Sequence, residues 1–268
     1  MQYDPVKRSL GKVFNQTPVL RILFYKLLDL LLLRTWHLKK EIRKWAKQKN
    51  DSISILDAGS GFGQYVYYLS SINKQWTIKG VDVKDEQVED CNNFFKKINK
   101  PSVRFEIADL TTFSEENKYD LILSIDVMEH IEEDVCVFKN LHTSLKNQGM
   151  LLISTPSDQG GSDVHHEDEH SFISEHVRDG YNILDIENKL KDAGFSKVEA
   201  YYTYGCPGNI SWYLSMKYPI QLLNFSKIFF IVLPFYYLLT YPFSLILNFL
   251  DVTLKHNKGT GLLVKAWK

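Results

Sequence analysis

The sequence predicts an α/β protein with a doubly wound sheet. Between residues 53 and 204, short strand-like runs alternate with helix-like segments, which is the pattern of successive β-α-β units. A glycine-rich turn follows the first run, and an acidic residue stands at or just after the end of each of the first four. Because ligands bind beyond the carboxyl ends of strands in open α/β sheets, these acids are expected to share one site.

The strand-like runs are short, β-branched or aromatic, and mostly poor in interior charge, as buried parallel strands are. The predicted strands are 53–57, 76–83, 103–107, 119–125, 150–155, 197–204 and, after a long apolar stretch, 259–267. The predicted helices between them are 64–72, 84–99, 134–147 and 183–193. Before the sheet, Thr17 and Pro18 form the N-cap and first position of a helix that runs past Leu33, and a more polar helix follows over 35–49.

Composition narrows the class of protein. The 268 residues include 32 Lys and Arg and 32 Asp and Glu, and a net charge of zero argues against a nucleic-acid surface. The three cysteines, Cys91, Cys136 and Cys206, lie far apart in the sequence, so no disulfide framework is expected. We therefore expect the protein to work in a reducing compartment. The first ten residues lack the apolar run of a secretory signal, which favours a cytoplasmic location.

The most informative segment is I-S-I-L-D-A-G-S-G-F-G-Q at 53–64. Gly59, Gly61 and Gly63 follow a strand and precede a helix, so backbone can approach a nucleotide closely there. A dinucleotide fingerprint would need Gly or Ala where Gln64 stands. The carboxylate of Asp57 would repel a pyrophosphate and suits a ligand that carries an amino group, such as S-adenosylmethionine (SAM). The alternative is a glycine turn that merely connects strand to helix.

Three further acids follow the next three predicted strands. Asp82 can accept from both hydroxyls of a ribose, and Asp109 can accept from an adenine amino group while the amide of Leu110 donates to the ring. Asp126 closes the fourth strand. Two of these acids have an alternative structural role. Asp109 could be the N-cap of a helix that starts at Thr111, and Asp82 could be a turn residue.

These segments together resemble the class I SAM-dependent methyltransferases, over about residues 36–204 and the last strand. The matching segments are L-D-A-G-S-G-F-G at 56–63, G-V-D-V at 80–83, A-D-L at 108–110, Y-D-L-I-L-S-I-D-V-M-E-H-I at 119–131 and G-M-L-L-I-S-T-P at 149–156. The resemblance implies an enzyme, a seven-stranded and mostly parallel sheet, and an antiparallel last strand. D-V-M-E-H-I-E-E-D is most similar to the quinone-biosynthesis type and to related small-molecule methyltransferases.

The resemblance also implies roles for individual residues. Asp57 and the loop with Gly59, Ser60, Gly61 and Gly63 would hold the methionine part of the cofactor. Asp82 would hold the ribose, Val83 would lie against the adenine, and Asp109 with Leu110 would read its edge. Ser124, in the fourth strand, completes the predicted cofactor set.

Methyl transfer to oxygen also needs a base, usually His or a carboxylate. Asp126, Glu129 and His130 share one face if a helical turn begins after the fourth strand. The alternative for His130 is a local capping or packing role.

A second cluster of candidates lies in the loop at 160–180, where His170 and His176 are the preferred bases or substrate contacts. The same loop also contains His165 and His166. Two other interpretations of the loop are a polar segment without chemistry and a divalent-metal site. Its spacing fits no standard zinc pattern, and no metal is predicted.

Two segments are strongly apolar. Residues 228–250 carry no charge and, as a helix, would be long enough to cross a bilayer. Both ends of this insertion must return to one sheet, and Pro234 and Pro242 should break a straight span, which favours a bent helical hairpin that enters one leaflet. The run at 19–34 is similar, with its interior charges on one side. A lid, a dimer core and a true span are the alternatives.

The predicted organisation is an N-terminal apolar helix (1–34), a SAM-binding domain (35–206 with 257–268) and a hydrophobic insertion (207–256). The predicted function is methyl transfer to a small, lipophilic acceptor (quinone-like, isoprenoid or lipid) by an enzyme resting on the inner membrane face. Oxygen is favoured over carbon or nitrogen as the accepting atom. The alternatives are a soluble, dimeric enzyme acting on a small metabolite and a non-catalytic membrane adaptor.

Overall fold

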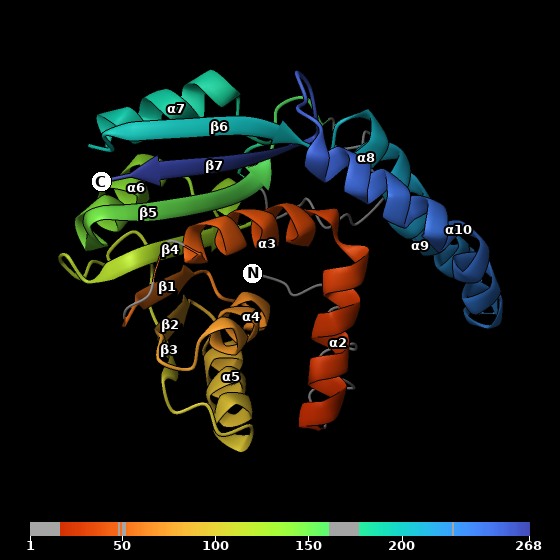
Figure 1. Ribbon diagram of the computed structural model, residues 1–268, viewed down its shortest axis with the longest axis horizontal. Helices are drawn as coiled ribbons and strands as arrows, with labels where there is room; N and C mark the ends of the chain where they lie inside the picture. Colours follow the sequence, from red (N-terminus) through yellow and green to blue (C-terminus); the bar gives the residue numbers. More distant parts are fainter. Residues whose placement is uncertain (1–16, 48, 50–51, 161–176, 227) are drawn as a thin grey trace.

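The computed structural model describes residues 17–47, 49, 52–160, 177–226 and 228–268 (Figure 1). Its seven-stranded sheet has the order β3-β2-β1-β4-β5-β7-β6, and only β7 is antiparallel to its neighbours within it. The strands are β1 (Ser54–Ala58), β2 (Thr77–Asp82), β3 (Val103–Ile107), β4 (Tyr119–Ile125), β5 (Leu145–Pro156), β6 (Lys197–Thr203) and β7 (Gly261–Trp267). The predicted fold class is confirmed.

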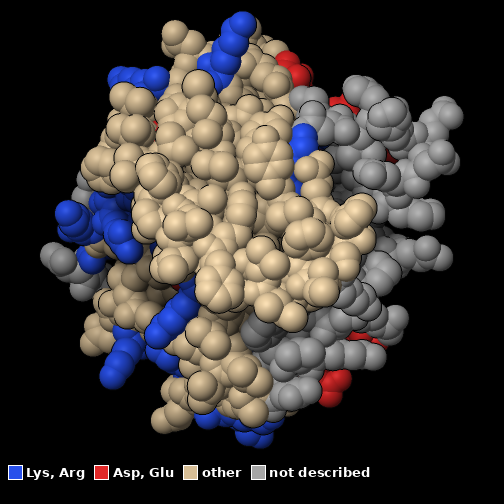
Figure 2. All heavy atoms as spheres, turned by 90° about the vertical axis from the view of Figure 1, so that its right-hand side faces the viewer, with Lys and Arg blue, Asp and Glu red and all other residues tan. Residues whose placement is uncertain are grey.

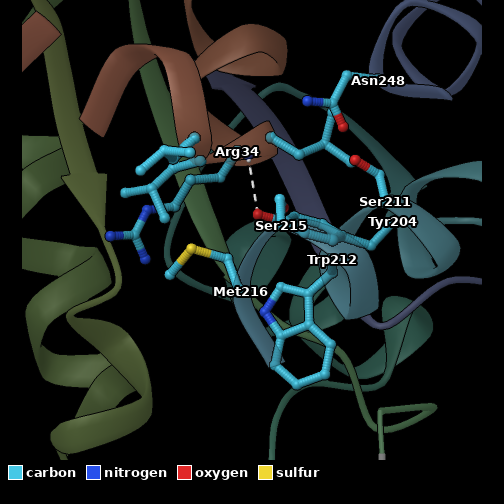
Figure 3. A pocket seen from close by; sticks show the side chains of 10 residues that line it. Arg34, Tyr204, Ser211, Trp212, Ser215, Met216 and Asn248 are labelled. Carbon is cyan, nitrogen blue, oxygen red and sulfur yellow. Dashed lines mark hydrogen bonds between the residues drawn. The ribbon is translucent and has the colours of Figure 1, made fainter. Parts of the chain in front are cut away.

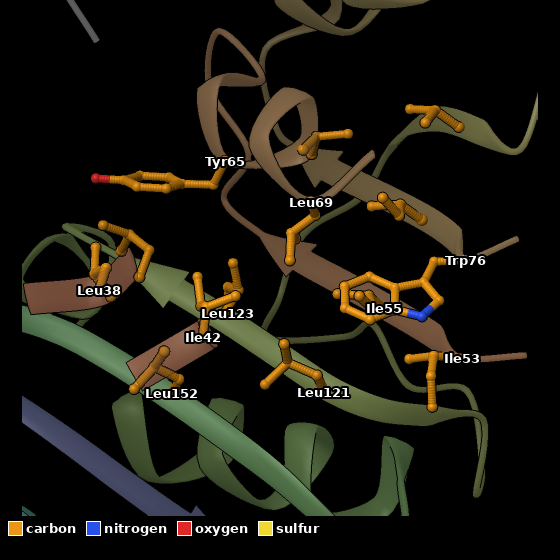
Figure 4. Packing of buried hydrophobic residues seen from close by; sticks show 14 of the residues in the cluster. Leu38, Ile42, Ile53, Ile55, Tyr65, Leu69, Trp76, Leu121, Leu123 and Leu152 are labelled. Atoms are coloured by element: carbon orange, nitrogen blue, oxygen red, sulfur yellow. The ribbon is translucent and has the colours of Figure 1, made fainter. Parts of the chain in front are cut away.

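Helices cover both faces of the sheet. One face carries α2 (Pro18–Leu31), α3 (Leu33–Ala46), α4 (Gln64–Ile72) and α5 (Asp85–Lys97), and the other carries α6 (Asp134–Ser144) and α7 (Ile183–Asp192). Successive strand residues alternate between the two cores, as the period of a strand requires: Ile55 is in the first core and Leu56 in the second. In Figure 4, Leu38 and Ile42 of α3 lie in the first core with the residues of β1 and β4.

Two predicted helix boundaries differ from the structure. The N-terminal helix ends at Leu31, because Leu32 adopts an extended conformation (φ −91°, ψ 109°) that separates α2 from α3. The N-cap at Thr17 is confirmed, since its side chain accepts from the amide of Leu20. The helix predicted over 134–147 ends at Ser144, and β5 begins directly after it. Leu145 adopts an extended conformation (φ −73°, ψ 142°), which ends the helix.

The insertion before β7 forms a helical hairpin that projects from the edge of the sheet (Figure 1). Its first arm is α8 (Cys206–Trp212), the π-helical turn η2 (Tyr213–Lys217) and α9 (Tyr218–Phe225), and its second arm is α10 (Phe229–Thr253). The predicted break at Pro234 and Pro242 was wrong, since α10 continues through both. The first arm is bonded to α10 between the two prolines: the hydroxyls of Tyr236 and Tyr237 donate to carbonyls in η2.

A buried carboxylate attaches this hairpin to the rest of the protein. Asp251, near the end of α10, is fully buried and accepts from the amides of Tyr204 and Gly208. His37 of α3 lies 2.8 Å from one of its oxygens, and His256 lies 3.2 Å from the other. Burial acts to raise the pKa of Asp251, but the hydrogen bond and charge of His37 and the charge of His256 keep it below its usual value.

We expect Asp251→Ala to lower the free energy of unfolding by about 3–5 kcal/mol, because it leaves the buried His37 and the amides of Tyr204 and Gly208 without their partner. His256 would keep only its contact with the backbone carbonyl of residue 251. Urea unfolding measures this cost. The exposed Asp185, which pairs with Lys189 on α7, provides the control Asp185→Ala, with an expected cost below about 1 kcal/mol. Equal costs for the two variants would contradict the role of Asp251.

The hairpin leaves a large apolar surface outside the protein core. Among the described residues, α10 is the one helix long and apolar enough to cross a membrane, and 6% of its most apolar window is buried. Figure 2 shows the molecule from the hairpin side, where a broad face has few charged side chains and Lys and Arg lie towards its margins. The division into residues 1–34, 35–206 with 257–268, and 207–256 remains a prediction.

Candidate active site

The carboxyl ends of β2, β1 and β4, neighbours in the sheet, bring three of the predicted acids to one edge. Asp57 lies in β1, Asp82 ends β2, and Asp126 directly follows β4. The negative charge of Asp82 is close enough to contribute to the raised pKa of Asp57. Asp109 lies beyond the adjacent strand β3 and is exposed. The structure therefore places the four acids at the ends of four neighbouring strands.

The glycine turn after β1 has the backbone conformation that its sequence predicts. Gly59, Gly61 and Gly63 have φ values of +84°, +48° and +74°, a region that other residues rarely adopt. A Cβ atom on Gly59 would lie 2.3 Å from a methyl carbon of Val127. The amide of Gly61 donates to the Asp82 carboxylate at 2.9 Å, which ties the turn to β2. Glycine is therefore required by conformation and, at Gly59, also by space.

Buried polar atoms around this turn lack protein partners. Asp57 is 1% exposed, and one of its carboxylate oxygens has no hydrogen-bond partner among the described residues. The buried hydroxyls of Ser60 and Ser124 also have no hydrogen-bond partner among the described residues. Such groups are normally satisfied, so their presence at strand ends indicates a ligand site. A ligand with an ammonium group, such as the methionine part of SAM, fits the carboxylate.

The remaining predicted cofactor residues border the same edge. Asp82 accepts from the amides of Gly61 and Lys84, and as a carboxylate it retains capacity for ribose hydroxyls. Val83 is 52% exposed, so its side chain is open to an adenine ring, while Leu110 is buried. Asp109 accepts from both the amide and the hydroxyl of Thr111 in a turn. The alternative N-cap role predicted for Asp109 was wrong, because residues 110–112 form a turn and no helix begins there. The cofactor roles of these residues remain predictions.

Residues that sequence reasoning did not select also reach this site. Arg34, at the start of α3, forms an ion pair with Asp126. Its amide donates to the hydroxyl of Tyr204, after β6, at 2.9 Å. Tyr65 of α4 is buried, which raises the pKa of its hydroxyl, and the nearby charges of Arg34 and Asp57 act on that pKa in opposite directions. The sequence offers one signal for Arg34, a charge at the end of an apolar run.

A helical turn follows β4, as expected, but Asp126 has a left-handed φ of +52° and lies outside it, so the helical face predicted for Asp126, Glu129 and His130 is not formed. Met128–His130 form a short 3-10 helix, and Glu129 within it is 1% exposed. The hydroxyl of Thr155 donates to Glu129 at 3.1 Å, yet burial raises the pKa of this carboxyl. His130 is half-buried, and its charge acts in the opposite direction on Glu129. His130 and Asp126 remain predicted catalytic residues.

The second predicted cluster gives less information. His170 and His176, with His165 and His166, lie outside the described residues. Arg178, which follows them, forms an ion pair with Asp134. Among the residues whose positions are described, no group of three or more His, Cys, Asp or Glu could hold a metal ion.

The raised pKa of Asp57 predicts a pH-dependent stability. Burial, assisted by the charge of Asp82, raises this pKa from 3.8 to about 7. Between these values the folded protein holds a proton that the unfolded chain releases, so the free energy of unfolding should fall as pH rises, by up to about 1.4 kcal/mol per pH unit. Asp57→Asn should remove this contribution. Urea unfolding at pH 5 and pH 7.5 measures it, with the exposed Asp192→Asn as control. An unchanged pH dependence in Asp57→Asn would contradict the assignment.

Comparison with known proteins agrees with this geometry. The sequence profile of the family described as "Methyltransferase domain" matches residues 49–202. The chain is 30% identical over 148 residues to phosphoethanolamine N-methyltransferase 1 of Triticum aestivum, which covers 54% of this chain and 29% of that protein. It is 26% identical over 106 residues to (S)-coclaurine N-methyltransferase of Papaver somniferum, covering 40% and 30%. The chain thus matches about a third or less of each relative's length.

A solved structure with a similar fold is phosphoethanolamine N-methyltransferase 2 of Haemonchus contortus in complex with SAM. The similarity covers 87% of this chain and 52% of that chain, with a TM-score of 0.61 and 20% identity. The profile match accounts for more than half of the present sequence, including the glycine turn and the strand-end acids. The predicted family and the SAM cofactor are thereby confirmed, and the chain belongs to the methyltransferase-domain family.

Proposed function

We propose that this protein transfers a methyl group from SAM to a small, lipophilic acceptor at a membrane surface. The observation that carries the proposal is the position of an exposed apolar hairpin beside the edge of the sheet that bears the cofactor residues. Asp251 and its two histidines hold the hairpin there. A lipophilic acceptor could then reach the cofactor without leaving the membrane boundary.

Different residues of the chain would bind different parts of the cofactor. Asp57 would hold the ammonium group, Asp82 the ribose, and the glycine turn would admit the methionine part close to backbone. SAM supplies an activated methyl group on a sulfonium leaving group. The protein therefore has to orient the acceptor in line with that group and exclude water, which are the contributions that enclosed sites make.

Glu129 is the strongest candidate for the base. It is buried beside the cofactor edge, and burial raises its pKa, which makes it a stronger base than an ordinary carboxylate. Asp126, by contrast, is ion-paired with Arg34, which suits a positioning role. The names of the two curated relatives favour nitrogen as the methyl-accepting atom, in place of the oxygen that the sequence alone favoured.

The apolar surface supports attachment to a membrane. Phe235, Leu238, Leu239 and Phe243 of α10 are between 64% and 73% exposed. On α2, Val19 is 75% exposed. Apolar surfaces of this extent on a protein are rarely left in water and mark contacts with membranes or other proteins. The tyrosines and phenylalanines of the hairpin suit the boundary between lipid and water.

We expect the protein to float with liposomes of phosphatidylcholine and phosphatidylglycerol in a density gradient. The double variant Leu238→Glu, Leu239→Glu should remain at the bottom of the gradient. Each of these exposed leucines would contribute about 1.5–3 kcal/mol to membrane binding when the bilayer buries it. Leu184→Glu on α7, where the leucine is 66% exposed, is the control and should float. A wild-type protein that stays at the bottom as a stable dimer would overturn membrane attachment and favour a soluble enzyme.

The reaction is tested by incubating the protein with SAM carrying a labelled methyl group and a membrane lipid extract. A lipid-soluble product should gain the label.

Glu129→Gln should lower turnover about 100-fold or more, because the base is lost while the amide oxygen can still accept from the hydroxyl of Thr155. Its affinity for SAM, measured by calorimetry, should not change. The exposed Glu132→Gln is the control. No label in the extract and no binding of SAM would instead favour a non-catalytic adaptor.

A further inference from the structure

We propose that a cavity between the hairpin and the bend joining α2 to α3 binds a neutral hydroxyl group of the methyl acceptor, and that Asn248 is its partner. This inference rests on the proposed function and deepens it. The cavity has a volume of about 110 Å³, and its lining includes Arg34, Tyr204, Ser211, Trp212, Met216 and Asn248 (Figure 3). We call it the Asn248 cavity.

Asn248 is out of place in its surroundings. It belongs to α10, whose sequence is almost entirely apolar, yet it is 1% exposed. Neither its side-chain nitrogen nor its side-chain oxygen has a hydrogen-bond partner among the described residues. A buried amide without partners is destabilising, and its retention needs an explanation such as a ligand. Because the amide lines the cavity, the ligand would lie there.

The chemistry of the amide selects the ligand group. Its nitrogen only donates and its oxygen only accepts. A carboxylate or phosphate would leave the oxygen of Asn248 without a partner, and an ammonium group would leave the nitrogen without one. A hydroxyl satisfies both, since it donates and accepts. Arg34, which also lines the cavity, is paired with Asp126 through one terminal nitrogen, while its Nε has no hydrogen-bond partner among the described residues and is a further donor that a hydroxyl oxygen can satisfy.

The size and position of the cavity fit the head of an amphiphile. Its volume equals that of about three to four water molecules in the liquid, enough for a small polar group but not for an apolar body. Trp212 in its wall is 37% exposed, so an apolar body can continue along the hairpin surface. Arg34 connects the cavity to the cofactor edge through Asp126. A hydroxyl anchored at Asn248 would therefore hold the acceptor on the side of the hairpin that Arg34 joins to Asp126 and the predicted cofactor residues.

The test measures binding of three probes of equal chain length by calorimetry with SAM present: 1-octanol, octanoate and octylamine. Octanol should bind the wild-type protein about tenfold more tightly than the other two. Asn248→Leu should weaken octanol binding about tenfold and leave SAM binding unchanged. Asn224→Leu changes an exposed asparagine of the same hairpin and should bind octanol as the wild type does.

A thermal-unfolding measurement separates this role from a structural one. If Asn248 serves a ligand, Asn248→Leu should keep or raise the melting temperature, because an unpartnered amide is replaced by an apolar group of the same branched shape, and the adjoining cavity has room for its larger methyl groups. A lower melting temperature with unchanged octanol binding would overturn the inference, and so would equal affinities of the wild type for the three probes. The probe comparison needs no variant, so it decides even if Asn248→Leu fails to fold. Methyl transfer from labelled SAM is assayed separately, so failure of the proposed function is distinguished from failure of this inference.

Discussion

The site depends on one physical constraint, which is that the carboxylate of Asp57 is buried at the end of β1. One of its oxygens has no hydrogen-bond partner among the described residues. The desolvation of a carboxylate is unfavourable, and the neighbouring charge of Asp82 adds to the cost, as the raised pKa of Asp57 shows. A cationic ligand offsets both effects at once. The site is thus arranged so that binding of an ammonium-bearing molecule relieves a strain that the fold itself maintains.

The glycine turn is the structural complement of that carboxylate. Its three left-handed glycines bend the chain sharply between β1 and α4, and the amide of Gly61 fastens the turn to Asp82. The same hydrogen bond therefore positions the turn and one of the predicted ribose contacts. Because the strands on both sides are buried in two cores, this local geometry is held by the whole sheet.

Parts of the chain outside the sheet complete the site. Arg34 brings the bend between α2 and α3 to Asp126, and Asp251 brings the hairpin to the same side of the molecule. Both connections are ion pairs between segments far apart in sequence. They join an apolar, exposed surface to a polar cofactor edge, which is the combination that an enzyme acting on a lipophilic acceptor needs.

The sequence by itself determined the fold class and the cofactor edge. Strands are recognisable from short apolar runs, and a parallel sheet necessarily gathers the residues that end them, so Asp57, Asp82 and Asp126 could be grouped before any coordinates. Sequence reasoning failed where contacts override local preference: α10 continues through two prolines while its tyrosines are hydrogen-bonded to the first arm, and α6 ends early because Leu145 is extended and joins the sheet. Only the tertiary structure placed Arg34 and Asn248, and only it showed that Glu129, which the sequence already grouped with His130, is buried. Burial and the absence of a hydrogen-bond partner are properties of packing between distant segments, and no local pattern of residues encodes them.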